Sequence, residues 1–315
     1  MRDLFYNVED IKKQHMATTT DEVLQHEFVN VNGIRMHYVT MGNGPLIVFL
    51  HGFPEFWYSW RHQIPFFSKY FKVVVPDMRG YGETERPTKI DEYRIEKLVT
   101  DIVELIHSLG QETATIVGHD WGGAIAWSIA MMASGIVEKL IIMDAPHPAV
   151  FQKNAFRNYE QMQKSWYMFF FLLQNVPESM LSRNNFELLK YVFEISIKRK
   201  KKFTQRDIEG YVSSWSKEGG ITGGINYYRS NLNAEFWGSL DQSIPFPKIK
   251  SPTLQIWCQE DIFLGKELTE GTSEFVDAPF SLKIIPNCGH WIQQEAPQEV
   301  NQIIDEFLDY NLNKN

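Results

Sequence analysis

One aspartate stands where a nucleophile would be expected in a short segment bounded by glycines. Asp120 is the centre of the segment 118–122 (GHDWG), with glycine two residues before it and two residues after it. This spacing is typical of a nucleophile elbow, the sharp strand-to-helix turn that raises one side chain above a sheet. A serine there must be deprotonated before it attacks, whereas an aspartate is already ionised at neutral pH. The segment therefore favours displacement at saturated carbon, either epoxide opening or carbon–halogen cleavage, over acyl transfer.

An ester formed on Asp120 needs a general base to activate water for its hydrolysis, usually a histidine oriented by an acid. His290 directly follows one expected strand, and Asp261 directly follows an earlier one. The order nucleophile, acid, histidine is that of α/β-hydrolases. We therefore expect Asp120, Asp261 and His290 to be catalytic residues. Glu260 and Asp144 stay open as alternatives for the acid, because Glu260 adjoins Asp261 and Asp144 follows the strand before an insertion.

Two backbone N–H groups are expected to stabilise the oxyanion that forms when water attacks the ester. The segment 51–54 (HGFP) follows a buried strand, and the N–H of Phe53 suits the first donor. Pro54 has no N–H, so it shapes the loop without donating. The N–H of Trp121, directly after the nucleophile, is expected to be the second donor. His119 is expected to be structural, because the side chain beside the nucleophile points away from the cleft.

Alternating strand and helix patterns must position these residues. Asn32-Gly33 between apolar runs predicts a hairpin. Strands are then expected at 45–50, 72–75, 114–117, 140–143, 253–257 and 282–285, and helices at 94–109, 124–132 and 298–310. Such alternation predicts parallel strands in a sheet that helices cover on both faces.

This rhythm is interrupted after Pro148 by an aromatic-rich and charge-rich stretch of mostly helical pattern. We therefore predict an α/β fold of the α/β-hydrolase type, with a mostly parallel sheet, helices on both faces and a helical lid inserted in it. The expected parts are an N-terminal extension at 1–24, a core at 25–146 and 244–315, and a lid at 147–243.

Composition excludes several classes of function. The chain of 315 residues has a formal net charge of −8, which disfavours nucleic acid and anionic membranes as partners. No apolar stretch reaches about 18 residues and no secretory signal is visible, so we expect no membrane insertion and a cytoplasmic location.

Cys258 and Cys288 are expected to be free buried thiols. No spacing typical of metal ligands or of a phosphate loop is present, so we expect no metal and no cofactor. A homodimer stays open.

Three motifs together give the chain a resemblance to a known family. Segments 51–60 (HGFPEFWYSW), 77–82 (DMRGYG) and 118–123 (GHDWGG) resemble the oxyanion loop, the next loop and the nucleophile elbow of α/β-hydrolase-fold epoxide hydrolases. The resemblance runs from about residue 28 to residue 308. Taken singly, the same motifs also fit haloalkane and haloacetate dehalogenases.

The resemblance implies that two lid tyrosines donate protons to the epoxide oxygen. The segment 225–229 (INYYR) resembles the family's lid motif, in which the second aromatic residue is the donor, here Tyr228. On a helix, adjacent residues point about 100° apart, so only one of Tyr227 and Tyr228 can face the pocket. The segment 165–171 (SWYMFFF) is expected to supply the second donor, Tyr167.

The sequence therefore predicts an epoxide hydrolase that acts on a small apolar epoxide, with Trp121, Trp166 and Phe170 in the substrate pocket. Two alternatives are kept. A dehalogenase would bind halide with tryptophans such as Trp121 and Trp166. A haloacetate dehalogenase would also need an arginine beside the nucleophile to bind the substrate carboxylate, and this chain has Trp121 there. A non-catalytic ligand receptor of the same fold would not need Asp120, Asp261 and His290 together.

Overall fold

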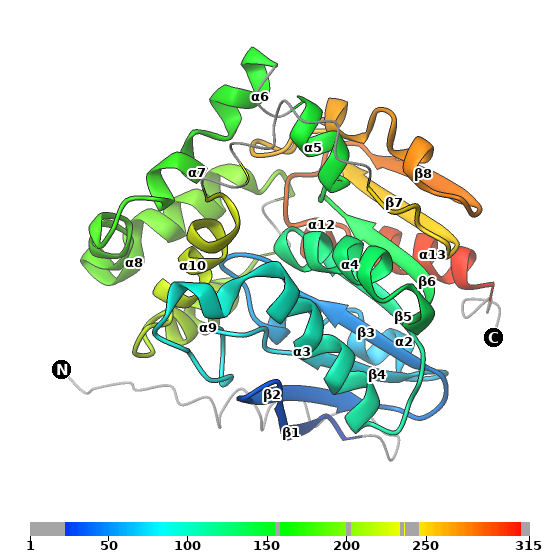
Figure 1. Ribbon diagram of the computed structural model, residues 1–315. Helices are drawn as coiled ribbons and strands as arrows, with labels where there is room; N and C mark the ends of the chain where they lie inside the picture. Colours follow the sequence, from blue (N-terminus) through cyan, green and yellow to red (C-terminus); the bar gives the residue numbers. More distant parts are fainter. Residues whose placement is uncertain (1–22, 155–157, 200–202, 234–235, 237–245, 310–315) are drawn as a thin grey trace.

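An eight-stranded sheet runs through the centre of the computed structural model (Figure 1). The structure describes residues 23–154, 158–199, 203–233, 236 and 246–309. The strand order is β1-β2-β4-β3-β5-β6-β7-β8. The strands are β1 (Gln25–Val31), β2 (Ile34–Met41), β3 (Leu46–Leu50), β4 (Lys72–Pro76), β5 (Ala114–His119), β6 (Val137–Met143), β7 (Thr253–Cys258) and β8 (Phe280–Ile285).

The register of the sheet confirms the predicted hairpin and the predicted parallel core. Strands β1 and β2 pair antiparallel with Val31 opposite Ile34, and both turn residues, Asn32 and Gly33, have positive φ as a two-residue hairpin turn requires. Strand β2 is also antiparallel to β4, whereas all later neighbours pair in parallel. The carboxyl ends of β3, β5, β6 and β7 therefore share one edge of the sheet, where α/β proteins place their ligand sites.

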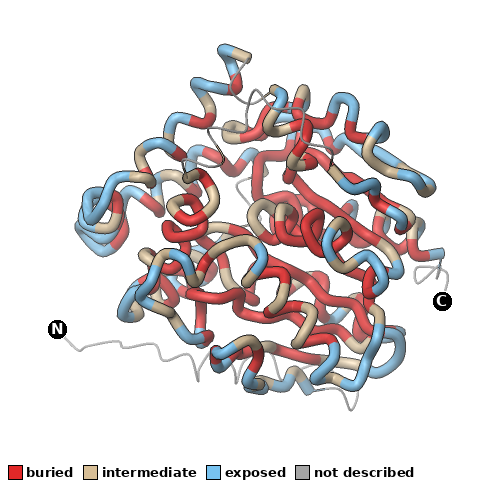
Figure 2. Tube along the Cα trace, in the orientation of Figure 1, coloured by how far each residue is buried: buried red, intermediate tan, exposed pale blue. Residues whose placement is uncertain are grey.

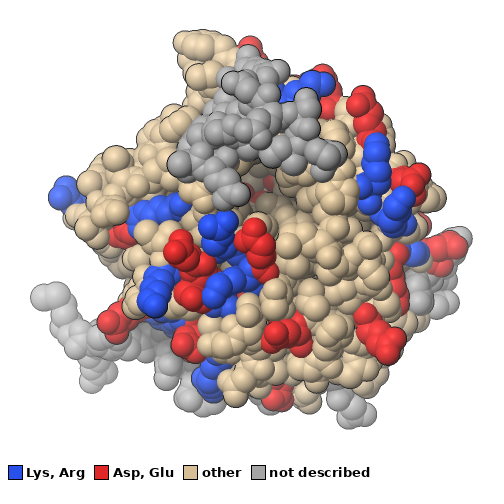
Figure 3. Space-filling view, viewed as in Figure 1, with Lys and Arg blue, Asp and Glu red and all other residues tan. Residues whose placement is uncertain are grey.

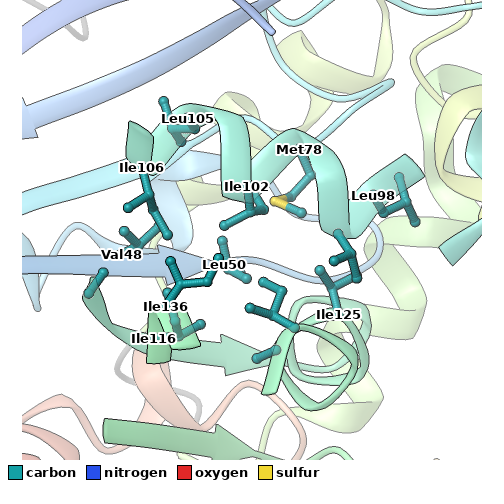
Figure 4. Close-up of a cluster of buried hydrophobic side chains, with 14 of the residues drawn as sticks. Val48, Leu50, Met78, Leu98, Ile102, Leu105, Ile106, Ile116, Ile125 and Ile136 are labelled. Carbon is teal, nitrogen blue, oxygen red and sulfur yellow. The ribbon is translucent and has the colours of Figure 1, made fainter. Parts of the chain in front are cut away.

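Helices cover both faces of the sheet, as expected from the alternating pattern. On one face lie α3 (Ile95–Ser108) and α4 (Trp121–Met132), and on the other α2 (Ile64–Phe67), α12 (Ile292–Glu295) and α13 (Pro297–Leu308). Figure 4 shows Ile106 of α3 beside Val48 and Ile102 of α3 beside Leu50, with Leu98 farther along the same helix. Such helical spacing buries one apolar side of the helix, and Figure 2 shows the buried residues concentrated along the sheet and these helices.

Between β6 and β7, the structure gives the bounds of six helices among the described residues. They are α5 (Pro148–Asn154), α6 (Tyr159–Lys164), α7 (Trp166–Phe171), α8 (Val176–Ser196), α9 (Gln205–Trp215) and α10 (Thr222–Asn231). Residues 183–186 interrupt α8 with non-helical backbone angles. Short 3-10 turns lie elsewhere, at η1 (Trp57–Trp60), η2 (Ile90–Tyr93), η3 (Ser134–Ile136), η5 (Lys266–Thr269) and η6 (Thr272–Phe275).

The inserted helices have their own apolar cluster, which includes Trp291 of the core. We call α5–α10 the lid. Its domain boundaries stay a prediction. Parts of all three predicted regions lie outside the described residues: 1–22 of the extension, 155–157, 200–202, 234–235 and 237–243 of the lid, and 244–245 and 310–315 of the core.

Side-chain hydrogen bonds join the lid to the segments that carry the expected chemistry. The Trp215 indole donates to the Pro54 carbonyl at 2.7 Å, and the Trp291 indole donates to the Ser196 hydroxyl at 2.6 Å. Cys258 and Cys288 are buried free thiols, as predicted. Within the described part of the chain, no helix is both long and apolar enough to cross a membrane.

Candidate active site

The turn between β5 and α4 forces Asp120 into an uncommon backbone conformation. Asp120 has φ 52° and ψ −121°, and it immediately precedes the first residue of α4. A Cβ at Gly118 would lie 2.3 Å from the Gly122 carbonyl oxygen, and one at Gly122 would lie 2.2 Å from the Leu50 carbonyl oxygen. Both positions therefore require glycine, because the turn packs backbone directly on backbone. The residue spacing of the elbow follows from this crowding.

The Asp120 carboxylate lies beside the loop that follows β3. Its Oδ1 atom accepts a hydrogen bond of 2.8 Å from the N–H of Phe53. A Cβ at Gly52 would lie 2.3 Å from that same oxygen, so the loop approaches only because residue 52 is glycine. Burial would raise the pKa of Asp120, but the imidazoles of His290 and His119 and the Phe53 N–H together hold it below its ordinary value. The carboxylate is therefore ionised before any reaction.

His290 lies between two carboxylates. Its Nδ1 atom is 2.7 Å from Oδ2 of Asp261, and its Nε2 atom is 3.7 Å from Oδ2 of Asp120. The other oxygen of Asp261 accepts from the N–H groups of Phe263 at 2.7 Å and Leu264 at 3.0 Å. Asp261 is thereby fixed by its own loop while it orients the imidazole. The structure thus brings together the three residues that the sequence singled out.

The charge state of His290 depends on those carboxylates. Burial lowers the pKa of an imidazole, because it disfavours the charged form. Here the negative charges of Asp261 and Asp120 outweigh burial and raise the pKa of His290 well above its ordinary value. The two carboxylates therefore favour the charged, imidazolium form of His290.

The two alternative acids are placed differently from Asp261. Asp144 directly follows β6 and is fully buried, and its Oδ1 atom accepts from the Cys258 N–H at 2.7 Å. Burial, and then the charge of Asp261, raise the pKa of Asp144 to about 7. The side chain of Glu260 is partly exposed, and its Oε2 atom lies 3.9 Å from Nζ of Lys198. The geometry therefore favours Asp261 as the acid that orients His290.

Two lid tyrosines face the nucleophile. Tyr228 on α10 and Tyr167 on α7 both line the cavity that contains Asp120, and their rings meet edge to face at 6.0 Å. Burial is the main reason that the pKa of each phenol lies well above its ordinary value, and the nearby Asp120 charge acts in the same direction. Both hydroxyls are therefore protonated donors. Tyr227 instead points into the core, where its hydroxyl donates to the Arg79 carbonyl at 2.8 Å.

The cavity above Asp120 measures about 430 Å³. Its polar end carries Asp120, Tyr167 and Tyr228, and the rest is mostly apolar. It continues along one side of α4, past Trp121, Ala124, Ser128, Met131 and Met132. A mostly apolar cavity with a few converging polar groups is typical of a small-molecule site.

Comparison with known proteins agrees with this geometry. A family model described as the alpha/beta hydrolase fold matches residues 45–297. Human epoxide hydrolase 4 is 40% identical over 291 residues, which cover 90% of this chain and 78% of that protein. Epoxide hydrolase 3 of Xenopus tropicalis is 38% identical over 292 residues, which cover 90% of this chain and 78% of that protein. This chain belongs to the epoxide hydrolase family of the α/β-hydrolase fold. It is therefore a hydrolase.

A solved member of the epoxide hydrolase family has the same architecture. The crystal structure of Bacillus megaterium epoxide hydrolase in complex with an inhibitor matches with a TM-score of 0.83 and 35% identity, over 90% of this chain and all of that one. The match covers both the sheet and the inserted helices, because it spans nearly the whole described chain.

The structure differs from the sequence prediction at two pocket positions. Trp121 lines the cavity as predicted, but Trp166 is 64% exposed on the outer side of α7. Phe170 packs against Phe171 and Trp166 and is not among the cavity-lining residues. The reason is helical phase: α7 turns Tyr167, Met168 and Phe171 inward, which leaves its neighbours facing out.

A buried polar network behind the site was missed by the sequence analysis. Glu55 is fully buried, and its carboxylate accepts hydrogen bonds from His119, Gln293 and Gln294. His119 in turn bonds to the carbonyl oxygen of His290 at 2.8 Å. His119 is therefore structural, as expected, and it fixes the backbone of His290. The available signal was the single acidic residue in the mostly aromatic segment 55–60.

One group of described side chains has the composition of a metal site. Ligand atoms of His119, Asp144 and His290 all lie within 4.8 Å of one another. Both ring nitrogens of His119 are already engaged, by Glu55 and by the His290 carbonyl, and Nδ1 of His290 is engaged by Asp261. These hydrogen bonds occupy nitrogen positions that a cation would need, so the group does not fit a metal ion.

Proposed function

We propose that this member of the epoxide hydrolase family converts small apolar epoxides into vicinal diols through an ester on Asp120. One observation carries the proposal: the carboxylate of Asp120 and the phenols of Tyr167 and Tyr228 line the same mostly apolar cavity. The pKa of the carboxylate is lowered and the pKa of each phenol is raised, which favours an anionic nucleophile facing two proton donors. A nucleophile facing two proton donors suits a three-membered ring whose carbon is attacked while its oxygen gains a proton.

In the first step, Oδ2 of Asp120 attacks an epoxide carbon. The C–O bond of the ring breaks, and its electron pair goes to the ring oxygen. Tyr228, assisted by Tyr167, donates the proton that this oxygen needs, so that no free alkoxide has to form. Oδ1 of Asp120 is held by the Phe53 N–H, and it becomes the carbonyl oxygen of the ester.

In the second step, His290 is the base. Ester formation removes the negative charge of Asp120, which had helped to raise the pKa of His290. The imidazole therefore loses its proton more easily and can take one from water, which attacks Cγ of Asp120. The oxyanion develops on Oδ1, beside the Phe53 N–H; we expect the Trp121 N–H, which has no partner within α4, to be the second donor. The proton that His290 gives up on ester formation returns to the tyrosine, and the proton that it takes from water restores the imidazolium. The Cγ–Oδ2 bond of Asp120 then cleaves, and Oδ2 leaves in the diol with the second proton of the attacking water.

The dehalogenase alternative is weakened by the position of Trp166. A halide pocket formed by Trp121 and Trp166 would need both indoles beside Asp120, but Trp166 lies on the outer side of the lid. The receptor alternative is weakened by the hydrogen-bonded pair of Asp261 and His290 beside Asp120. A cytoplasmic location and a homodimer stay predictions.

A side-by-side assay tests the proposed function. Purified protein is incubated with styrene oxide, a fatty-chain epoxide, a haloalkane and fluoroacetate, and diol and halide are measured in each reaction. We expect diol from the epoxides and no halide from the other two substrates. Halide release without diol would favour the dehalogenase, and tight ligand binding without any turnover would favour the receptor.

A further inference from the structure

One buried glutamine stands out on α6, a helix whose other side chains reach the surface. Gln161 is the buried residue of this helix, and it has no exposed surface at all. Burying an amide is costly unless its polar atoms are hydrogen-bonded, so the partners of a buried amide indicate what it holds in place. The reaction steps proposed above do not use Gln161.

The amide of Gln161 holds the loop that carries Asp261. Its Nε2 atom donates to the carbonyl of Phe263 at 2.8 Å, and its Oε1 atom accepts from the N–H of Gly265 at 2.8 Å. The same loop is fixed from within, because Asp261 accepts from the N–H of Phe263 at 2.7 Å. Asp261 orients His290 only while this loop keeps its shape, so the lid helps to determine where the acid lies.

The same amide also holds the residue directly before α7. Its Nε2 atom donates to the hydroxyl of Ser165 at 2.8 Å, and the N–H of Ser165 donates to the Gln161 carbonyl at 2.8 Å. Ser165 is fully buried and precedes Tyr167 by two residues. These two bonds therefore fix the start of the helix that carries the Tyr167 phenol. With the bonds to the Asp261 loop, both donors and the oxygen of the amide are used.

One aromatic ring lies between the two elements that Gln161 joins. The ring of Phe263 meets the ring of Tyr167 edge to face at 5.6 Å and the imidazole of His290 edge to face at 5.2 Å. A shift of the Phe263 backbone would therefore disturb contacts of a proton donor and of the base. Because Gln161 holds that backbone by its carbonyl, one amide positions groups that act in both reaction steps.

Charged groups contribute less to this junction. Figure 3 shows few charged side chains over α6 and α7. Lys164 of α6 reaches the same loop, where its Nζ atom donates to the Asp261 carbonyl at 3.0 Å, but its side chain is partly exposed. A long, partly exposed side chain keeps more conformational freedom than a buried one. Gln161 therefore fixes the junction between α6 and the Asp261 loop more firmly than Lys164 does.

We infer that Gln161 is a positioning residue that holds Tyr167 and the Asp261 loop in one arrangement, so that the second proton donor and the orienting acid are placed together. The inference rests on the proposed function, which gives these two residues their roles. Hydrogen bonds have preferred directions as well as distances, whereas apolar contacts can slide. A misplacement of about 1 Å can cost a hundredfold in rate. A buried amide therefore sets this geometry more strictly than an apolar side chain would.

A double-mutant cycle on the full-length protein tests the link to Tyr167. Gln161→Met is similar in length but loses all three side-chain bonds, so it should slow alkylation of Asp120 by styrene oxide by up to about a hundredfold. Tyr167→Phe should slow this alkylation in the wild-type background, but by less than about twofold once Gln161→Met is present. Tyr228→Phe should keep its full effect in both backgrounds, because Gln161 makes no hydrogen bond to α10.

The link to Asp261 is tested by the pKa of His290, measured by NMR titration. Titratable groups of the described chain surround this imidazole, namely Asp261, Asp120, Asp144 and His119. Of these, only Asp261 belongs to the loop that Gln161 holds. Its negative charge raises the pKa of His290, so a loosened loop should lower that pKa in Gln161→Met. A side chain that merely filled space in the lid would leave it unchanged.

Gln63→Met is the matched control. Gln63 is also fully buried, and its Nε2 atom donates to the Gln293 carbonyl at 3.1 Å and to the Asn301 side chain at 3.0 Å, on α12 and α13. This substitution should destabilise the protein. It should leave the effect of Tyr167→Phe and the pKa of His290 as they are in wild type.

Ser165→Ala covers the case in which Gln161→Met fails to fold, because it removes one bond and leaves those to the Asp261 loop. It should reduce the effect of Tyr167→Phe and leave the pKa of His290 unchanged. An equal Tyr167→Phe effect in wild type and in either folded variant would overturn the inference, as would an unchanged His290 pKa in Gln161→Met. Wild-type protein that forms no diol from styrene oxide would instead refute the proposed function.

Discussion

The Nε2 atom of His290 lies 3.7 Å from the Oδ2 atom of Asp120, and each group shifts the pKa of the other. The imidazole helps to keep the carboxylate ionised, and the carboxylate helps to keep the imidazole charged. This relationship ends when Asp120 becomes an ester, because the ester has no negative charge. The two steps of the proposed reaction therefore use two different protonation states of His290.

Replacing His290 by alanine should separate the two steps. Asp120 remains able to attack the epoxide, but no base activates water against the ester. His290→Ala should therefore accumulate a covalent adduct whose mass equals that of the epoxide, which intact-protein mass spectrometry detects. His107→Ala, an exposed histidine on α3, should turn over normally. A His290→Ala protein that binds epoxide but never gains mass would show that this histidine is not the hydrolytic base.

Removing the Tyr228 hydroxyl should slow the first step. A general acid is typically worth about 10² to 10⁴ in rate, so Tyr228→Phe should slow alkylation of Asp120 by roughly that factor. Tyr167→Phe should have a smaller effect, and the double variant should be nearly inactive. Pre-steady-state alkylation is the measurement, because slow hydrolysis would mask the change at steady state. Tyr227→Phe is the matched control, since that hydroxyl bonds to the Arg79 carbonyl. Unchanged alkylation in Tyr228→Phe would contradict the assigned donor.

Hydrolysis of the ester should have a characteristic pH dependence. His290 acts as a base only when neutral, so the rate of ester hydrolysis should rise as the pH rises through its pKa in the ester. That pKa should lie below the raised pKa of His290 in the free enzyme, because the charge of Asp120 is absent. The decay of trapped ester across a pH series gives the first midpoint, and NMR titration of the free enzyme gives the second. Equal midpoints would contradict the claim that the charge of Asp120 raises the pKa of His290.

Asp144 should make the protein less stable as the pH rises. Its folded pKa of about 7 exceeds the ordinary value of 3.8. Between these values the folded state binds the proton more tightly than the unfolded chain, so the free energy of unfolding falls as the pH increases. One pKa unit corresponds to about 1.4 kcal/mol, so the total loss is on the order of 4 kcal/mol.

Asp144→Asn should remove this pH dependence, because an amide does not titrate. The amide oxygen can still accept the hydrogen bond from the Cys258 N–H. Urea unfolding at about pH 4 and about pH 8 measures the free energy of unfolding of both proteins. Asp144→Asn should be more stable relative to wild type at the higher pH than at the lower pH. Asp277→Asn is a suitable control: Asp277 is exposed, and Lys250 lowers its pKa, so it should show no such gain. Equal pH dependence in Asp144→Asn and wild type would disprove the assignment.

The sequence predicted those parts of the site that local backbone geometry determines. Gly118 is required because the elbow packs on its own backbone at Gly122, and Gly122 is required because it packs on the backbone of β3 at Leu50. The expected positions of Asp261 and His290 follow from where strands end. The side of a helix that faces inward is a tertiary property. Trp166 and Tyr167 are adjacent aromatic residues, and packing against the core turns the second toward Asp120 and the first outward.

Long-range partners were also beyond the reach of the sequence. The carboxylate of Glu55 meets Gln293 and Gln294 across more than two hundred residues of chain. The shift at Asp144 arises from burial and from the charge of Asp261, neither of which can be inferred from a residue type.

The central claim is that an oxygen of Asp120, and not one taken directly from water, enters the product. A single turnover with enzyme in excess, in water labelled with heavy oxygen, tests it most directly. The proposed mechanism predicts that the first diol is unlabelled and that one heavy oxygen appears in the Asp120 carboxylate, where peptide mass spectrometry locates it. Heavy oxygen in the first-turnover diol, with Asp120 unlabelled, would show direct attack by water and contradict the covalent mechanism.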